Sequence, residues 1–174
     1  MSKIVLITGA SSGIGKSTAE FLAAKNYTVY GTGRNPKSNP DDSYSLIPLD
    51  VTKLDSIEKA INHIITKEGR IDVLVNNAGI ERHGSVEELS MEDFKSVMET
   101  NYFGVLRCTK SLLPVMRSQE KGCIINVASV AGHISNTPLG AYAASKFALE
   151  AVSEALAQEV KPFNIRVAIV EPGI

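Results

Sequence analysis

A glycine-rich turn between an apolar run and a helical pattern restricts the fold of this chain more than any other feature. Ile4–Ile7 has the character of a buried strand, and the turn Thr8–Gly15, spaced Gly-x-x-x-Gly-x-Gly, leads from it into a helical pattern over 14–24. Glycine permits a tight turn and a close approach of the backbone to a ligand. Free N–H groups at a helix start, aided by the helix dipole, can bind phosphate. The segment predicts a cradle for a nucleotide diphosphate, with a purely structural turn as the alternative.

The same residues come close to a second phosphate-binding pattern. Ala10–Ser17 differs from the P-loop consensus in having alanine where the first glycine should be. Asp50, which follows the apolar run 46–49, could then serve as the acidic partner of a magnesium ion. The turn by itself leaves a dinucleotide cradle and a P-loop hydrolase both open.

Short runs rich in valine and isoleucine alternate with helical patterns along the whole chain. The runs cover residues 4–7, 28–30, 45–47, 71–75, 123–127 and 165–170, and helical spacing covers residues 14–24, 54–66, 94–116 and 142–160. Near-continuous apolar runs are typical of strands buried on both faces of a parallel sheet. The alternation predicts an α/β fold, a doubly wound parallel sheet flanked by helices, in a single domain over residues 1–174 with a surface loop at 35–45.

Composition excludes several classes of protein. The net charge is -1 and no basic run is present, so we expect no nucleic-acid partner. No stretch reaches the length of a membrane span, and we expect no membrane association. Two cysteines, Cys108 and Cys123, are too few for a disulfide framework, which favours a reducing, cytoplasmic compartment. The three histidines are scattered without a carboxylate or cysteine at ligand spacing, so we expect no metal site.

A tyrosine and a lysine four residues apart are candidates for acid–base catalysis. In the segment Tyr142-Ala143-Ala144-Ser145-Lys146, helical spacing places the phenol and the ammonium on one face. A nearby cation lowers the pKa of a phenol, and lowering it from about 10 to near 7 takes roughly 4 kcal/mol of differential stabilisation. Such a phenol would be an acid or base near neutral pH. The same spacing also occurs on ordinary solvated helix faces.

Polar and turn-forming residues follow three of the predicted strands. Ser129, the run Asn76–Gly79 and the pair Pro172-Gly173 each come after an apolar run. Open parallel sheets bind their ligands at the carboxyl ends of the strands. Asn101 lies within the longest helical pattern of the chain. For Asp50 and Asn76, turn formation or helix capping is the alternative to ligand binding.

Taken together, these motifs resemble those of the short-chain dehydrogenase/reductase family. They occur in the family's order and span nearly the whole chain: Thr8–Gly15, Asp50, Asn76–Gly79, Asn101, Ser129, Tyr142 with Lys146, and Pro172-Gly173. The resemblance implies a Rossmann fold and a nicotinamide cofactor, and it makes the P-loop interpretation of the turn a poor one. Family members continue past the equivalent of Ile174 into a substrate-binding segment, so we expect the C-terminal part of the family fold to be absent here, leaving a sheet edge and apolar surface open.

The resemblance also implies a role for each matching residue. Tyr142 would be the general acid or base, Lys146 would bind the nicotinamide ribose and lower the Tyr142 pKa, Ser129 would hydrogen-bond the substrate oxygen, and Asn101 would hold a water of a proton relay. The implied cofactor-binding set comprises Gly9, Ser11, Ser12, Gly13, Ile14, Gly15, Arg34, Asp50, Val51, Asn76, Asn77, Ala78, Gly79, Tyr142, Lys146, Pro172 and Gly173.

The end of the second strand bears on the choice of dinucleotide. NAD-preferring family members have an acidic residue there, which binds the ribose 2′-hydroxyl. This chain reads Gly31-Thr32-Gly33-Arg34 and has no carboxylate at that place. A guanidinium can pair with a 2′-phosphate. We therefore expect NADP(H), with NAD(H) as the alternative and an ordinary solvated arginine as the other interpretation of Arg34.

The resulting hypothesis is an NADP(H)-dependent oxidoreductase that interconverts a carbonyl and an alcohol. A module that senses NADP(H) without turnover is the alternative from another class, and the intact Asn101, Ser129, Tyr142 and Lys146 set argues against it. The substrate would be a small carbonyl or alcohol that the residues do not identify. A stripe of small residues, Ala148, Ala151, Val152 and Ala155, favours a homodimer or homotetramer, with packing inside one subunit as the alternative.

Overall fold

A computed structural model of the chain describes residues 2–37 and 43–173. Within them the strands β1 (Ile4–Ile7), β2 (Thr28–Gly33), β3 (Ser45–Pro48), β4 (Val73–Asn76), β5 (Gly122–Val127) and β6 (Ile165–Val170) form one parallel sheet in the order β3-β2-β1-β4-β5-β6. The order reverses between β1 and β4, which is the arrangement of a doubly wound dinucleotide-binding fold. The predicted fold class is confirmed. Residues 38–42 of the predicted surface loop lie outside the described ranges.

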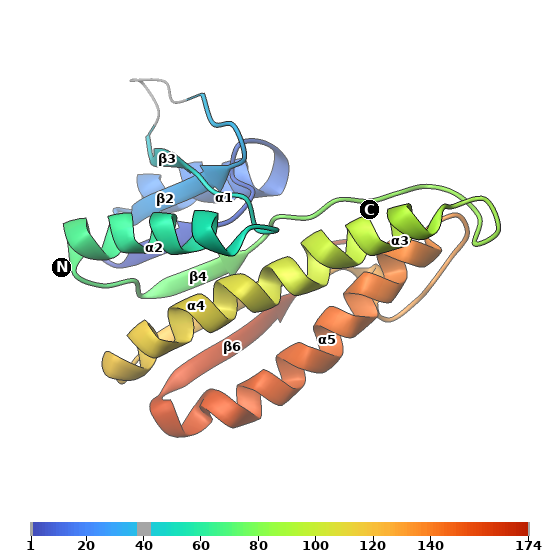
Figure 1. The fold of residues 1–174 in the computed structure, drawn as a ribbon. Helices are drawn as coiled ribbons and strands as arrows, with labels where there is room; N and C mark the ends of the chain where they lie inside the picture. The colour runs from blue at the N-terminus through green and yellow to red at the C-terminus, as the bar shows by residue number, and fades with distance from the viewer. Residues whose placement is uncertain (1, 38–42, 174) are drawn as a thin grey trace.

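Helices cover the sheet on both faces (Figure 1). On one face, α2 (Leu54–Glu68), α4 (Gly104–Ser118) and α5 (Gly140–Val160) pack over the strands, and α1 (Gly13–Ala24) packs on the other. Successive strand residues point to opposite faces: Ile4 and Leu6 join the core under α2 and α4, whereas Val5 and Ile7 join the core under α1. Each such aliphatic side chain contributes roughly 1.5–3 kcal/mol through burial. This double burial explains the near-continuous apolar runs of the strands.

Helix α2 illustrates how the sequence determines an element. Ile57, Ile61 and Ile64 recur at helical spacing and are buried against the sheet. Asp55 lies in the first turn and Lys67 in the last, where each charge is favourable to the helix dipole. Gly69 directly follows the helix and has φ of 76°, a left-handed conformation that glycine adopts without a steric penalty.

The long helical pattern at 94–116 does not form one uninterrupted α-helix. It begins earlier, with a capping box between Ser90 and Asp93, as α3 (Met91–Met98), passes through one π-helical stretch, η1 (Glu99–Phe103), and continues as α4. At the start of α4, Gly104 packs so tightly that a Cβ there would lie 2.8 Å from Cγ2 of Val51. The spacing of apolar residues does not reveal the extra residue of a π turn. Such turns are frequent at functional sites.

One part of the sheet is less covered than the rest. Strand β6 is the last strand of the described sheet, and a cavity of about 980 Å³ opens along β4, β5 and β6 on the side of α1. Its lining includes the apolar side chains of Val73, Ile125, Val127 and Val170. These side chains form an apolar surface on this part of the described sheet. In the described part of the chain, no helix has the length and hydropathy needed to cross a bilayer.

Candidate active site

The glycine turn lies at the carboxyl end of β1, packed against the residues that follow β4. Gly9 has φ of 68°, and a Cβ there would lie 2.7 Å from Cα of Ala78. The buried Thr8 hydroxyl accepts hydrogen bonds from the backbone N–H groups of Asn77 and Ala78, each at 3.0 Å. Glycine at position 9 is therefore required twice, by its backbone conformation and by the close approach of the second segment.

The side chain of Asn77 closes the same contact from the other side. Its amide donates to the carbonyl oxygens of Thr8 and Gly9, both at 3.0 Å. A Cβ on Gly15 would lie 2.4 Å from Nδ2 of Asn77, so Gly15 is needed for packing. Ser12 precedes α1 in an extended conformation and its side chain forms no cap. The first helical turn thus has no serine cap on its N–H groups, as in sites that bind a phosphate.

A cavity of about 550 Å³ lies beside this turn. Most of the predicted cofactor-binding set contributes to its lining, which comprises Gly9, Ser11, Ser12, Ile14, Gly33, Arg34, Leu49, Asp50, Val51, Thr52, Asn77, Ala78, Gly79, Ile80, Arg82 and Thr100. Asp50 accepts hydrogen bonds from the backbone N–H and the hydroxyl of Thr52, at 3.0 and 2.8 Å. Burial raises the pKa of Asp50, but these bonds and the charges of Lys53 and Arg34 outweigh it, so its pKa lies below the usual value.

A second cavity, of about 610 Å³, adjoins the first and shares Ile14, Asn77, Gly79 and Ile80 with it. Its other walls bring together Ser129, Tyr142, Lys146, Pro172 and Gly173, which the sequence places on three separate segments. Ser129 follows β5, Tyr142 and Lys146 lie in the first two turns of α5, and Pro172-Gly173 follow β6. The structure therefore assembles the predicted catalytic serine, tyrosine and lysine around one space.

The charges of Tyr142 and Lys146 are governed by burial. Lys146 is 5% exposed, and its Nζ donates to the carbonyl oxygen of Val127 at 2.8 Å while lying 5.5 Å from the centroid of the Tyr142 ring. Burial lowers the Lys146 pKa to about 8, with Glu150 opposing the change. For Tyr142, burial raises the pKa, the Ser129 hydroxyl lowers it and Glu81 raises it, with a net rise. The expected lowering of the Tyr142 pKa is wrong for this arrangement, because loss of water outweighs the other influences.

Asn101 lies in the π-helical turn, where it is buried and lines neither cavity. Its side chain accepts from the N–H of Ile80 at 2.8 Å and donates to the carbonyl of Ile80 at 2.8 Å and to the hydroxyl of Ser145 at 3.0 Å. Ser145 in turn donates to the carbonyl of Tyr142 at 2.7 Å. The asparagine therefore ties the segment after β4 to α5.

Asn76 is buried away from both cavities. It is 2% exposed and lines neither cavity. Its Nδ2 donates to Thr109 at 3.2 Å and to Asn126 at 2.9 Å, and Asn126 donates to Ser153 at 2.8 Å. Side chains alternate along a strand, so Asn76 turns into the interior and Asn77 faces the turn. A contact between Asn76 and a cofactor stays a prediction.

Some residues of the site were absent from the predicted set. Thr8 was recognised within the glycine motif but was assigned no role, although its hydroxyl joins the two segments. Ile80 and Ser145 hold Asn101, and Arg82 reaches the first cavity. A signal existed for Thr8, a hydroxyl residue at a strand end, but the partners of Asn101 depend on contacts between distant segments.

A parallel sheet of this order, with a phosphate-type turn after β1 and a tyrosine–lysine pair in the adjoining cavity, defines a dinucleotide-binding protein of the Rossmann type. The family model described as short chain dehydrogenase matches residues 3–174, and the chain belongs to that family.

Relatives of known name are reductases and dehydrogenases. A 3-ketodihydrosphingosine reductase of Bacteroides thetaiotaomicron is 47% identical over 171 residues, which cover 98% of this chain and 63% of the relative. The mitochondrial D-beta-hydroxybutyrate dehydrogenase of Rattus norvegicus is 37% identical, over 98% of this chain and 54% of the relative. This chain thus spans less than two thirds of the length of these relatives.

Solved structures agree closely with the fold. A short-chain dehydrogenase from Streptomyces avermitilis has a TM-score of 0.94 and 42% identity, covering 100% of this chain and 66% of that one. ElxO with NADP bound has a TM-score of 0.93 and 34% identity, covering 100% of this chain and 74% of that one.

Proposed function

We propose that this protein is an NADP(H)-dependent oxidoreductase that interconverts a carbonyl and an alcohol. The observation that carries the proposal is the convergence of Ser129, Tyr142 and Lys146 on one cavity that adjoins the cavity beside the glycine turn. The arrangement offers a proton donor, a hydroxyl and a cation side by side, next to a site suited to a diphosphate. The bound nicotinamide would supply the hydride.

Tyr142 would act as the proton donor when a carbonyl is reduced. A phenol whose pKa lies above its usual value is protonated at neutral pH, so it can donate that proton to a carbonyl oxygen as the oxygen gains charge. Ser129 would hydrogen-bond the same oxygen. Lys146, whose pKa lies at about 8, would hold the nicotinamide ribose and return a proton to the phenol. Because the side chain of Asn101 already has hydrogen-bond partners, a water held by Asn101 would donate a hydrogen bond to its main-chain carbonyl oxygen.

Arg34 supports NADP(H) over NAD(H). It lines the first cavity directly after β2, where the chain carries no carboxylate, and it lies near enough to Asp50 to lower that residue's pKa. A guanidinium can bind a 2′-phosphate through paired, charge-assisted hydrogen bonds. The solved structure of ElxO, 34% identical to this chain, holds NADP. We expect Arg34→Ala to reduce the ratio of kcat/KM for NADPH to that for NADH at least tenfold, and an unchanged ratio would contradict this assignment.

The second cavity favours a ketone carried on an apolar chain. Val130 and Ile134, both on its wall, are 44% and 64% exposed, and Ile80 and Leu139 extend the apolar lining. The relative with 47% identity is named for a ketone on a long-chain base. A short hydroxy acid, suggested by the name of the rat relative, is the second candidate.

One set of assays tests the proposal on the full-length protein. NADPH absorbance is followed with long-chain ketones, short keto acids and aldehydes, for the parent, for Tyr142→Phe and for a matched control, Tyr27→Phe, which lies away from both cavities. We expect Tyr142→Phe to lower kcat by about 10²–10⁴-fold with the Kd for NADPH little changed, and Tyr27→Phe to behave like the parent. NADPH binding without oxidation of any substrate would instead support a cofactor-sensing module. Full activity in Tyr142→Phe would refute the mechanism.

A further inference from the structure

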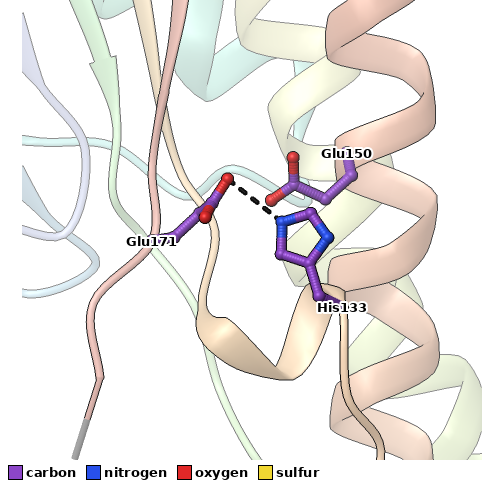
Figure 2. A group of neighbouring side chains, drawn as sticks. All are labelled: His133, Glu150 and Glu171. Carbon is purple, nitrogen blue, oxygen red and sulfur yellow. Dashed lines mark ion pairs between the residues drawn. The ribbon is translucent and has the colours of Figure 1, made fainter.

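Outside both cavities, three potential metal ligands converge from separate parts of the chain (Figure 2). His133 follows the short helix η2 (Val130–Gly132), Glu150 lies on α5, and Glu171 follows β6. One ligand atom from each residue lies within 4.8 Å of the other two. Nε2 of His133 and Oε1 of Glu171 are 3.1 Å apart. Local spacing does not reveal this cluster, because its members are 17 or more positions apart.

Glu150 is the unusual member of the cluster. The residue is 8% exposed, and its Oε1 is buried without a hydrogen-bond partner among residues 2–37 and 43–173. A buried carboxylate oxygen without a donor is costly. The carboxylate is directed toward His133 and Glu171 (Figure 2). Gly132 leaves the space for it, since a Cβ there would lie 3.1 Å from Oε1. A cation bound between Glu150, His133 and Glu171 would satisfy this oxygen.

We propose that His133, Glu150 and Glu171 form a binding site for a divalent transition-metal ion, with Zn²⁺ the best match. An imidazole nitrogen favours zinc over magnesium or calcium, which prefer oxygen ligands throughout. Two carboxylates balance the charge of the ion. Three protein ligands leave a fourth position for water, and His133 and Glu171 are 57% and 41% exposed, so an ion can enter from solvent.

The present geometry requires a modest closure around the ion. Ligand atoms about 2.1 Å from a tetrahedral zinc lie roughly 3.4 Å from one another. The pair His133–Glu171 already meets that separation, at 3.1 Å. The remaining separations, up to 4.8 Å, can shorten by rotation of the exposed His133 and Glu171 side chains toward the fixed carboxylate of Glu150.

The site would hold together three segments that line the second cavity. His133 comes four residues after Ser129, Glu150 lies one helical turn beyond Lys146, and Glu171 immediately precedes Pro172. The segments already touch, since the N–H of Val130 donates to the carbonyl of Pro172 at 3.2 Å. The ion would therefore be a positioning metal that touches neither substrate nor cofactor, and its binding does not depend on the reaction proposed above.

Zinc titration of the metal-free, full-length protein tests the site. We expect one equivalent of Zn²⁺ to bind by calorimetry, and Co²⁺ in its place to give the visible absorption of a four- or five-coordinate ion. His133→Ala and Glu150→Gln should each weaken Zn²⁺ binding at least tenfold and abolish the Co²⁺ band. Zn²⁺ should also raise the Tm of the parent and not that of His133→Ala.

The matched control is His83→Ala. His83 forms an equally short pair with Glu81, at 2.9 Å, but in the described part of the chain this pair has no buried third carboxylate. We expect His83→Ala to bind Zn²⁺ as the parent does. Binding that survives His133→Ala, that is lost equally in His83→Ala, or that is displaced by equimolar Mg²⁺ would overturn the proposal. Because His133 is exposed, its variant should fold even if Glu150→Gln does not.

Discussion

At the scale of single residues, desolvation decides the electrostatics of the site. Sequence spacing places a cation beside Tyr142, and Coulomb attraction alone would lower the pKa of the phenol. In the folded chain the ammonium of Lys146 is itself buried and donates to a backbone carbonyl, so its own pKa falls to about 8. The pKa of the half-buried phenol moves the other way. Sequence separation carries no information about solvent, which is why the direction for Tyr142 was wrong.

The buried lysine predicts a pH-dependent stability. In the unfolded chain Lys146 keeps its proton up to its usual pKa of 10.5, whereas in the folded protein it loses the proton at a pH of about 8. Between these values the unfolded state binds more protons, so the contribution of Lys146 to the free energy of unfolding rises with pH. The free energy of unfolding of the parent minus that of Lys146→Met should therefore increase by about 3 kcal/mol from pH 7 to pH 11.

Urea denaturation of both proteins across this range measures the difference. Other groups that titrate at high pH act on both proteins and largely cancel. A difference that stays flat, or that falls as the pH rises, would contradict the buried state of Lys146.

At the scale of elements, the β1–α1 turn and the segment after β4 form one packed unit. Thr8, Gly9 and Asn77 join them by four hydrogen bonds and a backbone approach that leaves no room for a methyl group. The glycines of the motif therefore differ in purpose. Gly9 and Gly15 are required by packing. Gly13 has φ of 54°, and no described neighbour lies within 4 Å of the place that a Cβ would take, so its backbone conformation alone favours glycine.

The packed unit predicts different costs for two glycine substitutions. Gly9→Ala and Gly69→Ala both place alanine at positive φ, at 68° and 76°, but no described neighbour lies within 4 Å of a Cβ at position 69. Gly69→Ala should lower the free energy of unfolding by about 1 kcal/mol. Gly9→Ala should lower it by a further ~1–3 kcal/mol through overpacking against Ala78 and should weaken NADPH binding. Chemical denaturation and NADPH titration check this; equal costs for the two variants would show that the contact with Ala78 is unimportant.

At the scale of the whole molecule, the sheet brings the site together. Parallel strands place all their carboxyl ends at one edge, so segments after β1, β4, β5 and β6 meet there. Both cavities lie at this edge. The same geometry brings His133 and Glu171 to Glu150, because η2 follows β5 and Glu171 follows β6, and these two strands are neighbours.

The exposed face of α5 predicts self-association of the full-length protein. Of the small residues in its stripe, Ala151 is exposed and Ala155 lies one helical turn further on, and the nearby Phe147 is 44% exposed. A helix face of small and apolar residues allows a second helix to approach closely. We expect a dimer or tetramer by light scattering, and Ala151→Arg should reduce the assembly. Lys16→Ala on the exposed surface of α1 is the control; a monomeric parent, or equal effects of both variants, would contradict this interface.

The sequence by itself determined the class of fold and most of the site. The evidence for the fold was local: near-continuous apolar runs, helical spacing between them and a glycine turn after the first run. Such patterns can be recognised in a sequence without knowledge of distant contacts. The order of such motifs along the chain carried the family resemblance, and the resemblance implied the site residues Gly9, Arg34, Asn77, Ser129, Tyr142 and Lys146, all of which line the two cavities.

Only the tertiary structure decided which face each polar residue presents and what surrounds it. It turned Asn76 into a buried network, inserted a π-helical stretch at Asn101, and removed water from Lys146 and Tyr142. It also gathered His133, Glu150 and Glu171 from three elements. Each of these depends on desolvation and on contacts between segments far apart in the chain. The local spacing of residues along the sequence determines neither of them.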